Sequence, residues 1–402
     1  MNREKIDNLK AKLFSRIYRS VRNSAIQRTY RRQEKANIQR IIDYLPVYPY
    51  DLEEVVELGD RRLKFIDRFL GSLVYDFRIP DDLEAQLYDL KFPSPITLAS
   101  FKGDLDIVGI WLRLGLGGAI LKTAMKDSRE GNPRPRLQQL DNGCLLNCMG
   151  LPGKGIDGFL EDFASFSEHH NNFVLSSPGI ISFEHQYKPI GFSIGGNSVE
   201  EYEQIFRKIE RDMIDKDISY FYEINPSCPN TKHGMQLITK PELLEELLDN
   251  MRRSTDRIIG IKLSPAQSDT MIVEFTRIAK KFERTYINVG NSRPVSCADV
   301  SLPINATSLG GGGLSGPSLY PRTRDMVELV SSMRIPIIAT GGVDSAEKVL
   351  EIMNLGANIV GMATAVVQDM YCIPLINREL SDLKRSEDAL RNRNNMVYLK
   401  YD

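Results

Sequence analysis

The chain has 402 residues, 42% of them apolar and 26% charged, which are the proportions of a soluble globular protein, and its formal net charge of −1 gives no reason to expect a nucleic-acid or membrane partner. Five scattered cysteines are too few for a disulfide framework and lack the spacing of a zinc or iron–sulfur site, and no apolar run approaches the roughly 18 residues of a membrane span. The chain also begins polar and charged, without the apolar stretch of a secretory signal, so we expect a reducing, cytoplasmic setting.

Residues 1 to about 42 are predicted to form an amphipathic helix with a basic polar face. Apolar residues recur at helical spacing from Ile6 to Val21, and Lys and Arg far outnumber Asp and Glu. Such a helix could pack on the main domain with its basic face solvated, lie on an anionic membrane, or bind RNA. Prolines and an acidic run at 46–57 are expected to mark a junction, and a second helix is expected over about Asp60 to Tyr75.

From Ile96 onward the pattern changes to a repeated unit of short apolar strand, loop and amphipathic helix. The predicted strands are Ile96–Ala99, Ala119–Lys122, Ile190–Ile194, Ile218–Ile224, Ile258–Leu263, Thr285–Val289, Pro336–Thr340 and Asn358–Met362. Helices are predicted at Val199–Ile214, Glu242–Arg252, Asp269–Phe282, Thr323–Met333 and Ser345–Leu355.

Eight strands that alternate with helices predict a (β/α)8 TIM barrel. A doubly wound open sheet gives a similar alternation, but it is disfavoured by the strand count and by the lack of a G-x-G-x-x-G after the first strand. The chain is thereby divided into a basic helical extension (1–90), the barrel (91–375) and a C-terminal helix or tail (376–402).

Ligands bind at the C-terminal ends of barrel strands, so we sought polar residues there. Lys122 and Lys262 each end an apolar strand, where a buried ammonium is costly unless it meets an anion; the alternative is that each reaches solvent. After the strand 218–224, Cys228 stands between Asn225 and Asn230 in a loop stiffened by two prolines. The thiol could be a base beside carboxamide clamps or a structural cysteine in a turn.

A phosphate site is indicated after the last two strands. Gly341 and Gly342 follow the seventh strand and Thr364 follows the eighth, the usual place for backbone N–H groups that hold a phosphate in such barrels. The strand ends offer no catalytic histidine, paired carboxylates or metal cluster. A phosphorylated cofactor that carries out redox chemistry therefore fits these residues better than a hydrolytic site does.

Over about Phe92 to Asp369 the chain resembles the dihydroorotate dehydrogenases, flavin enzymes of pyrimidine biosynthesis. The ordered motifs that carry the resemblance are Lys122-Thr123, Ser128–Arg136 (with the REGNPxPR run), Asn147–Pro152 (NxMGLP), Asn225–Asn230 (NxSCPN), Lys262, Asn291-Ser292, Gly313–Gly316 and Gly341-Gly342. The resemblance implies FMN-dependent oxidation of (S)-dihydroorotate to orotate. Cys228 would remove the C5 proton while a hydride passes from C6 to flavin N5.

The same resemblance assigns roles to individual residues. Lys122 would act in catalysis beside Cys228, and Lys262 would stabilise charge at the N1/O2 edge of the flavin. The implied substrate-binding residues are Lys122, Asn147, Met149, Gly150, Leu151, Asn225, Asn230, Asn291 and Ser292. The implied cofactor-binding residues are Ala99, Ser100, Lys122, Thr123, Asn225, Lys262, Asn288, Gly313, Gly316, Gly341, Gly342, Ala363 and Thr364.

Two features depart from the family pattern. Phe101 stands where the family usually has glycine, so the contact of the first-strand loop with flavin is open. A cysteine base resembles the soluble branch, which uses fumarate or passes electrons to NAD through a separate subunit, whereas the quinone-linked branch has a serine base and an N-terminal helical extension. Because this chain combines a cysteine with a long extension, the electron acceptor is open, as is peripheral membrane contact through residues 1–42. A homo-oligomer is expected.

The alternatives are a flavin enzyme of a related barrel family, either like the dihydrouridine synthases or a dihydropyrimidine-type oxidoreductase, and a binding module without catalytic activity. The tRNA dihydrouridine synthases, flavin enzymes of a related barrel family that act on uracil rings, share an Asn-x-x-Cys-Pro loop, and a basic N-terminus could hold RNA. They lack the motifs at Asn147–Pro152 and Ser128–Arg136. A flavin-binding interaction module docked on a membrane would leave the proposed base and substrate clamps without a use.

Overall fold

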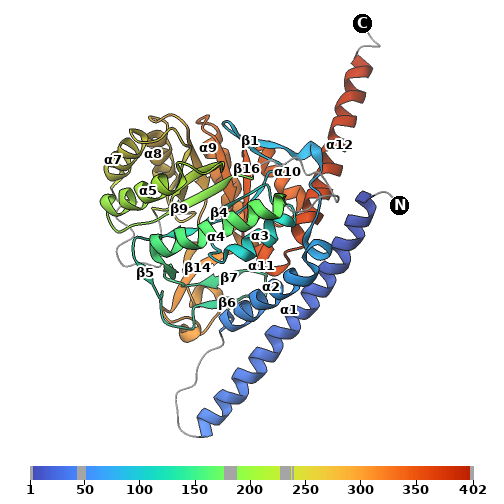
Figure 1. Ribbon diagram of the computed structural model, residues 1–402, viewed down its shortest axis with the longest axis vertical. Coiled ribbons are helices and arrows are strands. Elements are labelled where there is room, and N and C mark those ends of the chain that lie inside the picture. The colour runs from blue at the N-terminus through green and yellow to red at the C-terminus, as the bar shows by residue number, and fades with distance from the viewer. Residues whose placement is uncertain (1–2, 43–50, 176–187, 227–236, 238–239, 399–402) are drawn as a thin grey trace.

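The computed structural model describes residues 3–42, 51–175, 188–226, 237 and 240–398, and at its centre lies a closed barrel of parallel strands (Figure 1). In order around the barrel the strands are β3 (Ile96–Leu98), β4 (Gly118–Ala124), β9 (Ile190–Ile194), β10 (Tyr220–Ile224), β11 (Ile259–Leu263), β12 (Thr285–Val289), β15 (Ile337–Thr340) and β16 (Ile359–Met362). β16 pairs with β3 and closes the ring. This arrangement confirms the predicted (β/α)8 barrel and its eight strands. The strands form because these runs are apolar enough to be buried on both faces.

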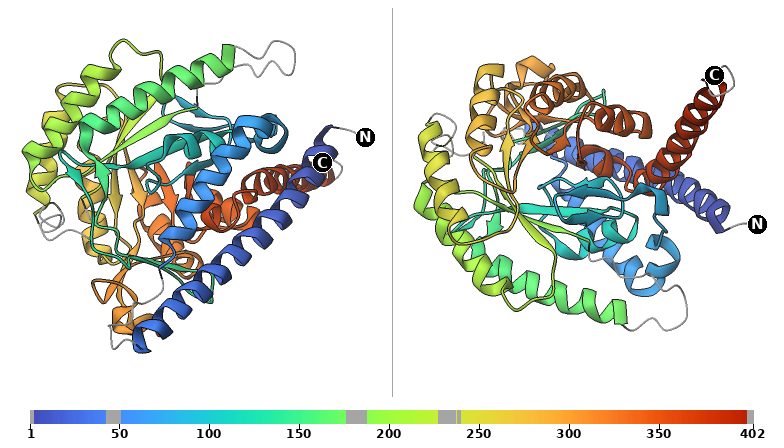
Figure 2. Two further views of the ribbon diagram at one scale, coloured as in Figure 1. Left: turned by 60° about the horizontal axis from the view of Figure 1, so that its bottom comes forward. Right: turned by 90° about the horizontal axis from the view of Figure 1, so that it is seen from above.

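Helices surround the barrel and cover the outer face of the strands (Figures 1 and 2). They are α3 (Leu105–Arg113), α4 (Gly155–Leu175), α5 (Val199–Met213), α7 (Pro241–Arg252), α8 (Asp269–Ala279), α9 (Tyr320–Ser331), α10 (Ala346–Asn354), the short α11 (Thr364–Gln368) and α12 (Cys372–Tyr398). Asp104, Ser198, Ser268 and Ser345 cap the helices that follow them, each accepting a hydrogen bond from a backbone N–H of the first turn. These caps explain why the predicted helix starts lie close to the observed ones.

The N-terminal extension is a pair of long helices, α1 (Arg3–Ile42) and α2 (Glu53–Tyr75). α2 lies between α1 and the barrel, and α1 also packs along α12 (Figure 2). The predicted start of the second helix near Asp60 is wrong. Its acidic first turn, with Glu53 and Glu54, is favoured by the helix dipole, and the Asp51 carboxylate accepts a hydrogen bond from the Glu53 N–H at 3.1 Å.

Small antiparallel sheets close the two ends of the barrel. The hairpin β1 (Ala85–Leu87) and β2 (Leu90–Phe92) packs against apolar residues at the N-terminal ends of the strands. Over the opposite end lie β6 (Leu137–Gln139), β7 (Leu145–Asn147), β13 (Arg293–Ser296) and β14 (Gly311–Ser315), together with the pair β5 (Ser128–Arg129) and β8 (Gly153–Lys154).

The three glycines at 311–313 form the start of β14. A Cβ on Gly312 would lie 2.3 Å from the backbone oxygen of Asn147 on the neighbouring β7, so the two strands can approach only with glycine there.

Candidate active site

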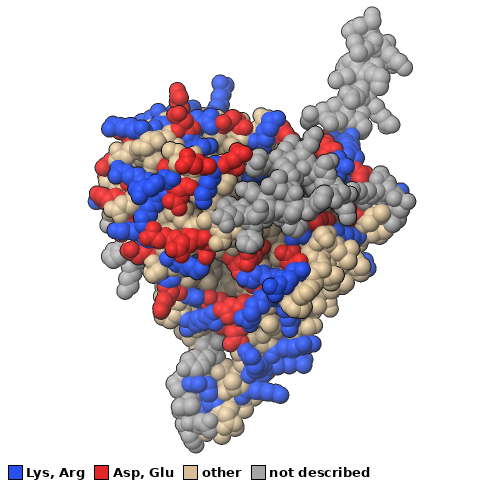
Figure 3. All heavy atoms as spheres, viewed as in Figure 1, with Lys and Arg blue, Asp and Glu red and all other residues tan. Residues whose placement is uncertain are grey.

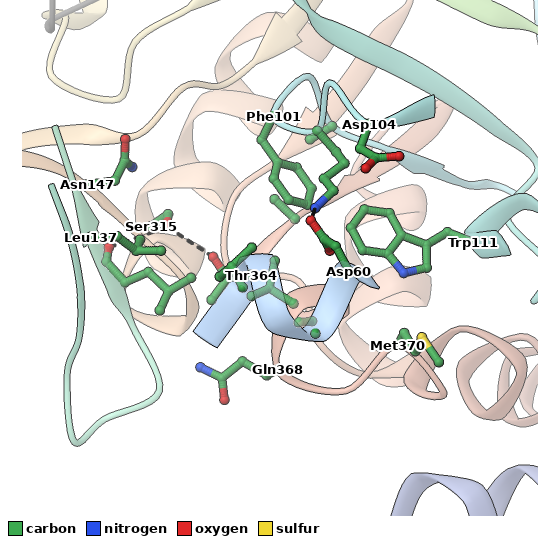
Figure 4. Close-up of a pocket in the computed structure, with 18 of the residues that line it drawn as sticks. Asp60, Phe101, Asp104, Trp111, Leu137, Asn147, Ser315, Thr364, Gln368 and Met370 are labelled. Atoms are coloured by element: carbon green, nitrogen blue, oxygen red, sulfur yellow. Dashed lines mark hydrogen bonds and ion pairs between the residues drawn. The ribbon is translucent and has the colours of Figure 1, made fainter. Parts of the chain in front are cut away.

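A cavity of about 1420 Å³ opens at the C-terminal ends of the barrel strands and continues beneath α2 and α1 (Figure 4). Most of the site residues expected from the sequence line it: Ala99, Ser100, Lys122, Thr123, Asn147, Met149, Leu151, Asn225, Lys262, Asn291, Ser292, Gly316, Gly341, Gly342, Ala363 and Thr364. Gly150, Asn288 and Gly313 do not line it. Cys228 and Asn230 lie outside the described residues.

One polar network holds the carboxamides. Asn225, at the end of β10, donates from Nδ2 to Thr123 Oγ1 at 3.0 Å and accepts at Oδ1 from Asn291 Nδ2 at 3.2 Å. Thr123 Oγ1 lies 2.9 Å from the Ser193 hydroxyl, and Tyr202 OH donates to the Asn225 backbone oxygen at 2.9 Å. Because these partners are buried, the two amide planes are held in one orientation and can recognise a planar ligand with amide groups.

A second network joins four strands inside the barrel. Lys262 on β11 donates to the Ser100 hydroxyl at 2.8 Å, and that hydroxyl donates to Glu223 Oε1 on β10 at 3.0 Å. Asn288 on β12 donates to Glu223 Oε2 at 2.5 Å. Lys262 is 5% exposed and its ammonium lies 3.7 Å from Glu223 Oε1, so it is a cation held in place at the floor of the cavity.

Lys122 is a lysine whose ammonium is available to bind a ligand. Its side chain lines the cavity and makes no hydrogen bond or ion pair with any residue the structure describes. Desolvation, followed by the repulsion of Arg136 and Lys102, lowers the pKa of Lys122 to about 8. An anionic ligand would restore the stability of its charged form, so this position favours a carboxylate.

The loop from Asn147 to Leu151 brings backbone to the cavity. Gly150 and Leu151 have φ of +73° and +55°, and this turn leaves Met149 and Leu151 in the lining of the cavity. Asn132 braces this loop from behind, because its backbone N–H donates to Met149 O at 3.0 Å and its side chain donates to Cys148 O at 2.8 Å. The REGNPxPR run therefore supports the wall of the cavity rather than forming its surface.

The glycines after β14 and β15, Gly316, Gly341 and Gly342, leave their backbone uncovered by side chains and form what we call the glycine cradle. Gly316, Gly341 and Gly342 have φ of +112°, +138° and +75°, and a Cβ on Gly342 would lie 2.5 Å from the Tyr320 nitrogen. Beside them Thr364 donates its hydroxyl to Ser315 Oγ at 3.0 Å (Figure 4). Backbone N–H groups and hydroxyls are the donors that proteins use for a phosphate dianion, so the residues present fit a phosphorylated cofactor.

The remaining arm of the cavity is apolar and is built by the extension. Its lining includes Phe14, Ile17, Tyr18, Leu63, Ile66, Leu70, Val74 and Tyr371. Phe101, the residue that departs from the family glycine, stacks on Trp111 with ring centroids 5.7 Å apart in the wall where the arm meets the polar site (Figure 4). Side-chain pairs hold α2 over this arm: Glu53 bonds Arg136 at 2.7 Å, and Lys64 bonds Asp104 at 2.9 Å.

Three residues of the site escaped the sequence analysis: Glu223, Ser193 and Tyr202. Glu223 could have been found from the sequence, because a carboxylate within the apolar strand 218–224 must be paired if the strand is buried on both faces. Ser193 and Tyr202 could not, because their roles depend on which strands are neighbours.

Among the described residues, no three His, Cys, Asp or Glu side chains are grouped so that they could hold a metal ion. Within the same ranges, no helix has both the length and the apolar character needed to cross a membrane.

Comparison with known proteins shows which family the chain is similar to. The profile of the family described as "Dihydroorotate dehydrogenase" matches residues 82–383. The chain is 32% identical over 315 residues to the "Dihydroorotate dehydrogenase B (NAD(+)), catalytic subunit" of Exiguobacterium sibiricum, across 77% of this chain and 93% of that protein. It is 30% identical over 290 residues to the protein of the same name from Pyrococcus abyssi, across 71% and 87% of the two chains.

A solved structure shares the fold. The dihydroorotate dehydrogenase of Eimeria tenella, crystallised in complex with ferulenol, superposes with a TM-score of 0.68 at 19% sequence identity, covering 82% of this chain and 92% of that one. The family match begins at residue 82, so α1 and α2 precede the part of the chain that the family profile describes.

Proposed function

This chain belongs to the dihydroorotate dehydrogenase family, and we propose that it oxidises (S)-dihydroorotate to orotate, a step in the synthesis of UMP, with flavin mononucleotide as its cofactor. The observation that carries the proposal is the meeting of three features in one cavity. These are the Lys122 ammonium, which has no partner among the described residues, the coupled carboxamides of Asn225 and Asn291, and the glycine cradle at Gly341-Gly342.

The flavin would be held along the barrel end by residues already in position. Its phosphate would lie in the cradle of Gly316, Gly341, Gly342 and Thr364, and its ring would lie near Ser100 and Lys262. When bound, FMN supplies a hydride acceptor at N5. The Lys262 ammonium would stabilise negative charge at the N1/O2 edge of the ring.

The substrate would be oriented by the chain's own donors. Lys122 would bind its carboxylate, and Asn147, Asn225 and Asn291 would hold its two ring amides. Asn225 donates a hydrogen bond to Thr123 and accepts one from Tyr202 at its backbone oxygen, and both keep the clamp in one geometry before the substrate arrives, which reduces the entropy lost on binding.

Removal of the C5 proton is assigned to Cys228. This role rests on the sequence, since Cys228 lies three residues after Asn225, whose side chain lines the cavity. A proton beside a carbonyl is only weakly acidic, so its base must be close to it and shielded from water.

The proposal is tested with the purified full chain. A bound flavin spectrum is expected, together with its bleaching by dihydroorotate under anaerobic conditions. Absence of bleaching, with oxidation of the reduced protein by uridine in tRNA, would instead support the dihydrouridine synthase alternative.

For the electron acceptor we propose a lipid-soluble quinone. The apolar arm leads from the polar site to the surface between α1 and α2, and its mouth includes the half-exposed residues Ile17, Val21 and Leu70. A charged dinucleotide would gain little from such a lining, whereas an apolar ring and tail would bury surface in it. The relatives' name favours NAD through a separate subunit, and fumarate is the third candidate.

Leu70→Glu is expected to raise the KM for a short-chain quinone about tenfold, because a carboxylate at the mouth of an apolar arm costs roughly 1.4 kcal/mol of ligand binding. Steady-state oxidation of dihydroorotate with each acceptor measures the effect. Leu73→Glu is the matched control, since Leu73 lies on the same helix, is 62% exposed and does not line the cavity. Equal KM values for the two variants, or turnover with NAD or fumarate but not with quinone, would contradict the quinone assignment.

The same helices are proposed to rest on a membrane surface. Phe65, Phe69, Leu70 and Leu73 on α2 are between 52% and 67% exposed, although side chains of this size are normally buried. Lys and Arg side chains project along α1 (Figure 3), the helix that packs against α2. An apolar patch next to a basic helix suits an anionic lipid surface, from which a quinone would enter the arm directly.

Phe65→Ser/Phe69→Ser is expected to weaken binding to vesicles of phosphatidylcholine and phosphatidylserine at least tenfold, since each ring loses more than ~1 kcal/mol of apolar burial. Co-sedimentation with and without phosphatidylserine measures this. Ile214→Ser serves as control, because Ile214 is 75% exposed but follows α5 on the barrel. Equal pelleting of parent and double variant would remove the membrane from the proposal.

A further inference from the structure

Glu223 is a fully buried carboxylate inside the barrel. It lies on β10, two residues before Asn225, and its exposed fraction is 0%. A carboxylate at such a place is strongly destabilising unless several donors surround it. Its neighbours on the adjoining strands therefore show what it is for.

Both oxygens of Glu223 accept hydrogen bonds. The Ser100 hydroxyl donates to Oε1 at 3.0 Å and Asn288 Nδ2 donates to Oε2 at 2.5 Å, while the Lys262 ammonium lies 3.7 Å from Oε1. These contacts suit an ionised carboxylate, whereas a neutral acid would need an acceptor for its own proton. Glu223 and Lys262 thus form a buried pair of opposite charges.

The donors to Glu223 are the residues expected to meet the flavin. Ser100 follows β3, Lys262 lies on β11 and Asn288 lies on β12, so three separate strands are joined through one carboxylate of a fourth. Among the described residues Lys262 forms an ion pair with Glu223 alone, and its ammonium donates a hydrogen bond to Ser100, which itself donates to Glu223. The position of the ammonium is therefore determined by Glu223, directly and through Ser100.

We propose that Glu223 is the positioning residue of the flavin site: it holds Lys262 in place and balances its charge, and thereby lowers the reduction potential of the flavin. The inference rests on the proposed function, because it requires a flavin above Lys262. Reduction leaves negative charge on the ring, and an unbalanced ammonium stabilises that charge more than a paired one does. Glu223 thus keeps reduced flavin able to pass its electrons on to an acceptor.

The test is Glu223→Gln, which keeps the shape of the side chain and removes its charge. The ratio of reduced to oxidised flavin at a fixed potential is expected to rise about tenfold, a shift of about 30 mV for a two-electron couple. Equilibration with a redox dye at pH 6 measures the potential. Sulfite, which adds reversibly to flavin and leaves an anionic ring, is expected to bind about tenfold more tightly as an independent reading.

Glu210→Gln is the matched control. Glu210 accepts a hydrogen bond from Tyr222 OH at 2.7 Å on the outer side of the same strand, so its loss disturbs β10 without reaching the flavin side. In this variant the ratio of reduced to oxidised flavin at a fixed potential is expected to stay within twofold of the parent's, and so is the affinity for sulfite.

A second comparison shows whether Glu223 acts through Lys262. In the Lys262→Met background, Glu223→Gln is expected to change the ratio of reduced to oxidised flavin at a fixed potential less than twofold. If the single variant loses its flavin, Glu223→Gln/Lys262→Met should retain it, because no unpaired charge is left buried. The inference would be overturned by an unshifted potential in Glu223→Gln, or by an equal shift with and without Lys262. It would also be overturned if the double variant lost its flavin while Lys262→Met alone retained it. A parent protein without flavin, or with flavin that dihydroorotate does not bleach, would overturn the proposed function instead.

Discussion

Lys122→Met is expected to weaken the binding of orotate about 100-fold. The ammonium lines the cavity and has no partner in the part of the chain that the structure describes, and truncating one member of a desolvated charge pair costs about 2–5 kcal/mol. Titration of the bound flavin spectrum with orotate measures the affinity. Flavin content is expected to be retained, which separates loss of the substrate clamp from loss of the fold. An affinity within threefold of the parent's would show that the carboxylate binds elsewhere.

The pH dependence of orotate binding checks the same assignment. The pKa of Lys122 is lowered to about 8 by desolvation and by Arg136 and Lys102, so its ammonium form is lost as pH rises through that value. Orotate keeps its carboxylate charge over this range. The dissociation constant of the parent is therefore expected to be flat below pH 7 and to rise above pH 8, by up to about tenfold per pH unit.

Two variants complete that experiment. Lys122→Met is expected to lose the pH dependence, because the titrating group is gone. Lys126→Met, which removes an exposed ammonium four residues away that does not line the cavity, is expected to keep it. A pH profile that survives in Lys122→Met would assign the titration to another group.

Cys228→Ala is expected to slow the reduction of flavin by dihydroorotate about 10²- to 10⁴-fold, the range over which a positioned base accelerates proton transfer. Orotate affinity is expected to change little, since its clamps remain. Cys228→Ser is expected to recover part of the rate as pH rises, because a hydroxyl ionises less readily than a thiol. Anaerobic stopped-flow absorbance of the flavin measures all three proteins.

The control for the base is Cys297→Ala. Cys297 is a buried thiol 3.5 Å from Thr307 Oγ1 in a small cluster that does not line the cavity, so its loss tests the general effect of removing a cysteine. Flavin reduction in Cys228→Ala within tenfold of the parent would mean that another group accepts the C5 proton.

Local sequence was sufficient for the barrel because its signals are short-ranged. Each strand is a compact apolar run between turn residues, and several helices begin at a capping Asp or Ser, so neither needs knowledge of its neighbours. The start of the second helix is harder to predict for a related reason. The acidic residues Glu53 and Glu54 suggest a break in the helical pattern, whereas at a helix N-terminus they are stabilising.

The site was predictable where a motif places polar residues at the end of a strand. Lys122, Asn225 and Lys262 could be located in this way because all parallel strands of a barrel end at the same face. The role of the REGNPxPR run could not be predicted in this way, because Asn132 supports the loop at Met149 through contacts with the loop backbone that no spacing in the sequence reveals.

The sequence by itself determined the eightfold alternation, the residues at the strand ends and the family they resemble, because each depends on order along the chain. Only the tertiary structure decided which of those residues touch. It paired Glu223 with Lys262 across neighbouring strands and placed Phe101 against Trp111. It also laid two N-terminal helices over the barrel to form an apolar arm. The sequence could not show these contacts, because the Glu223–Lys262 pair depends on which strands are neighbours in the closed barrel, and the other contacts depend on how loops and helices pack over its end.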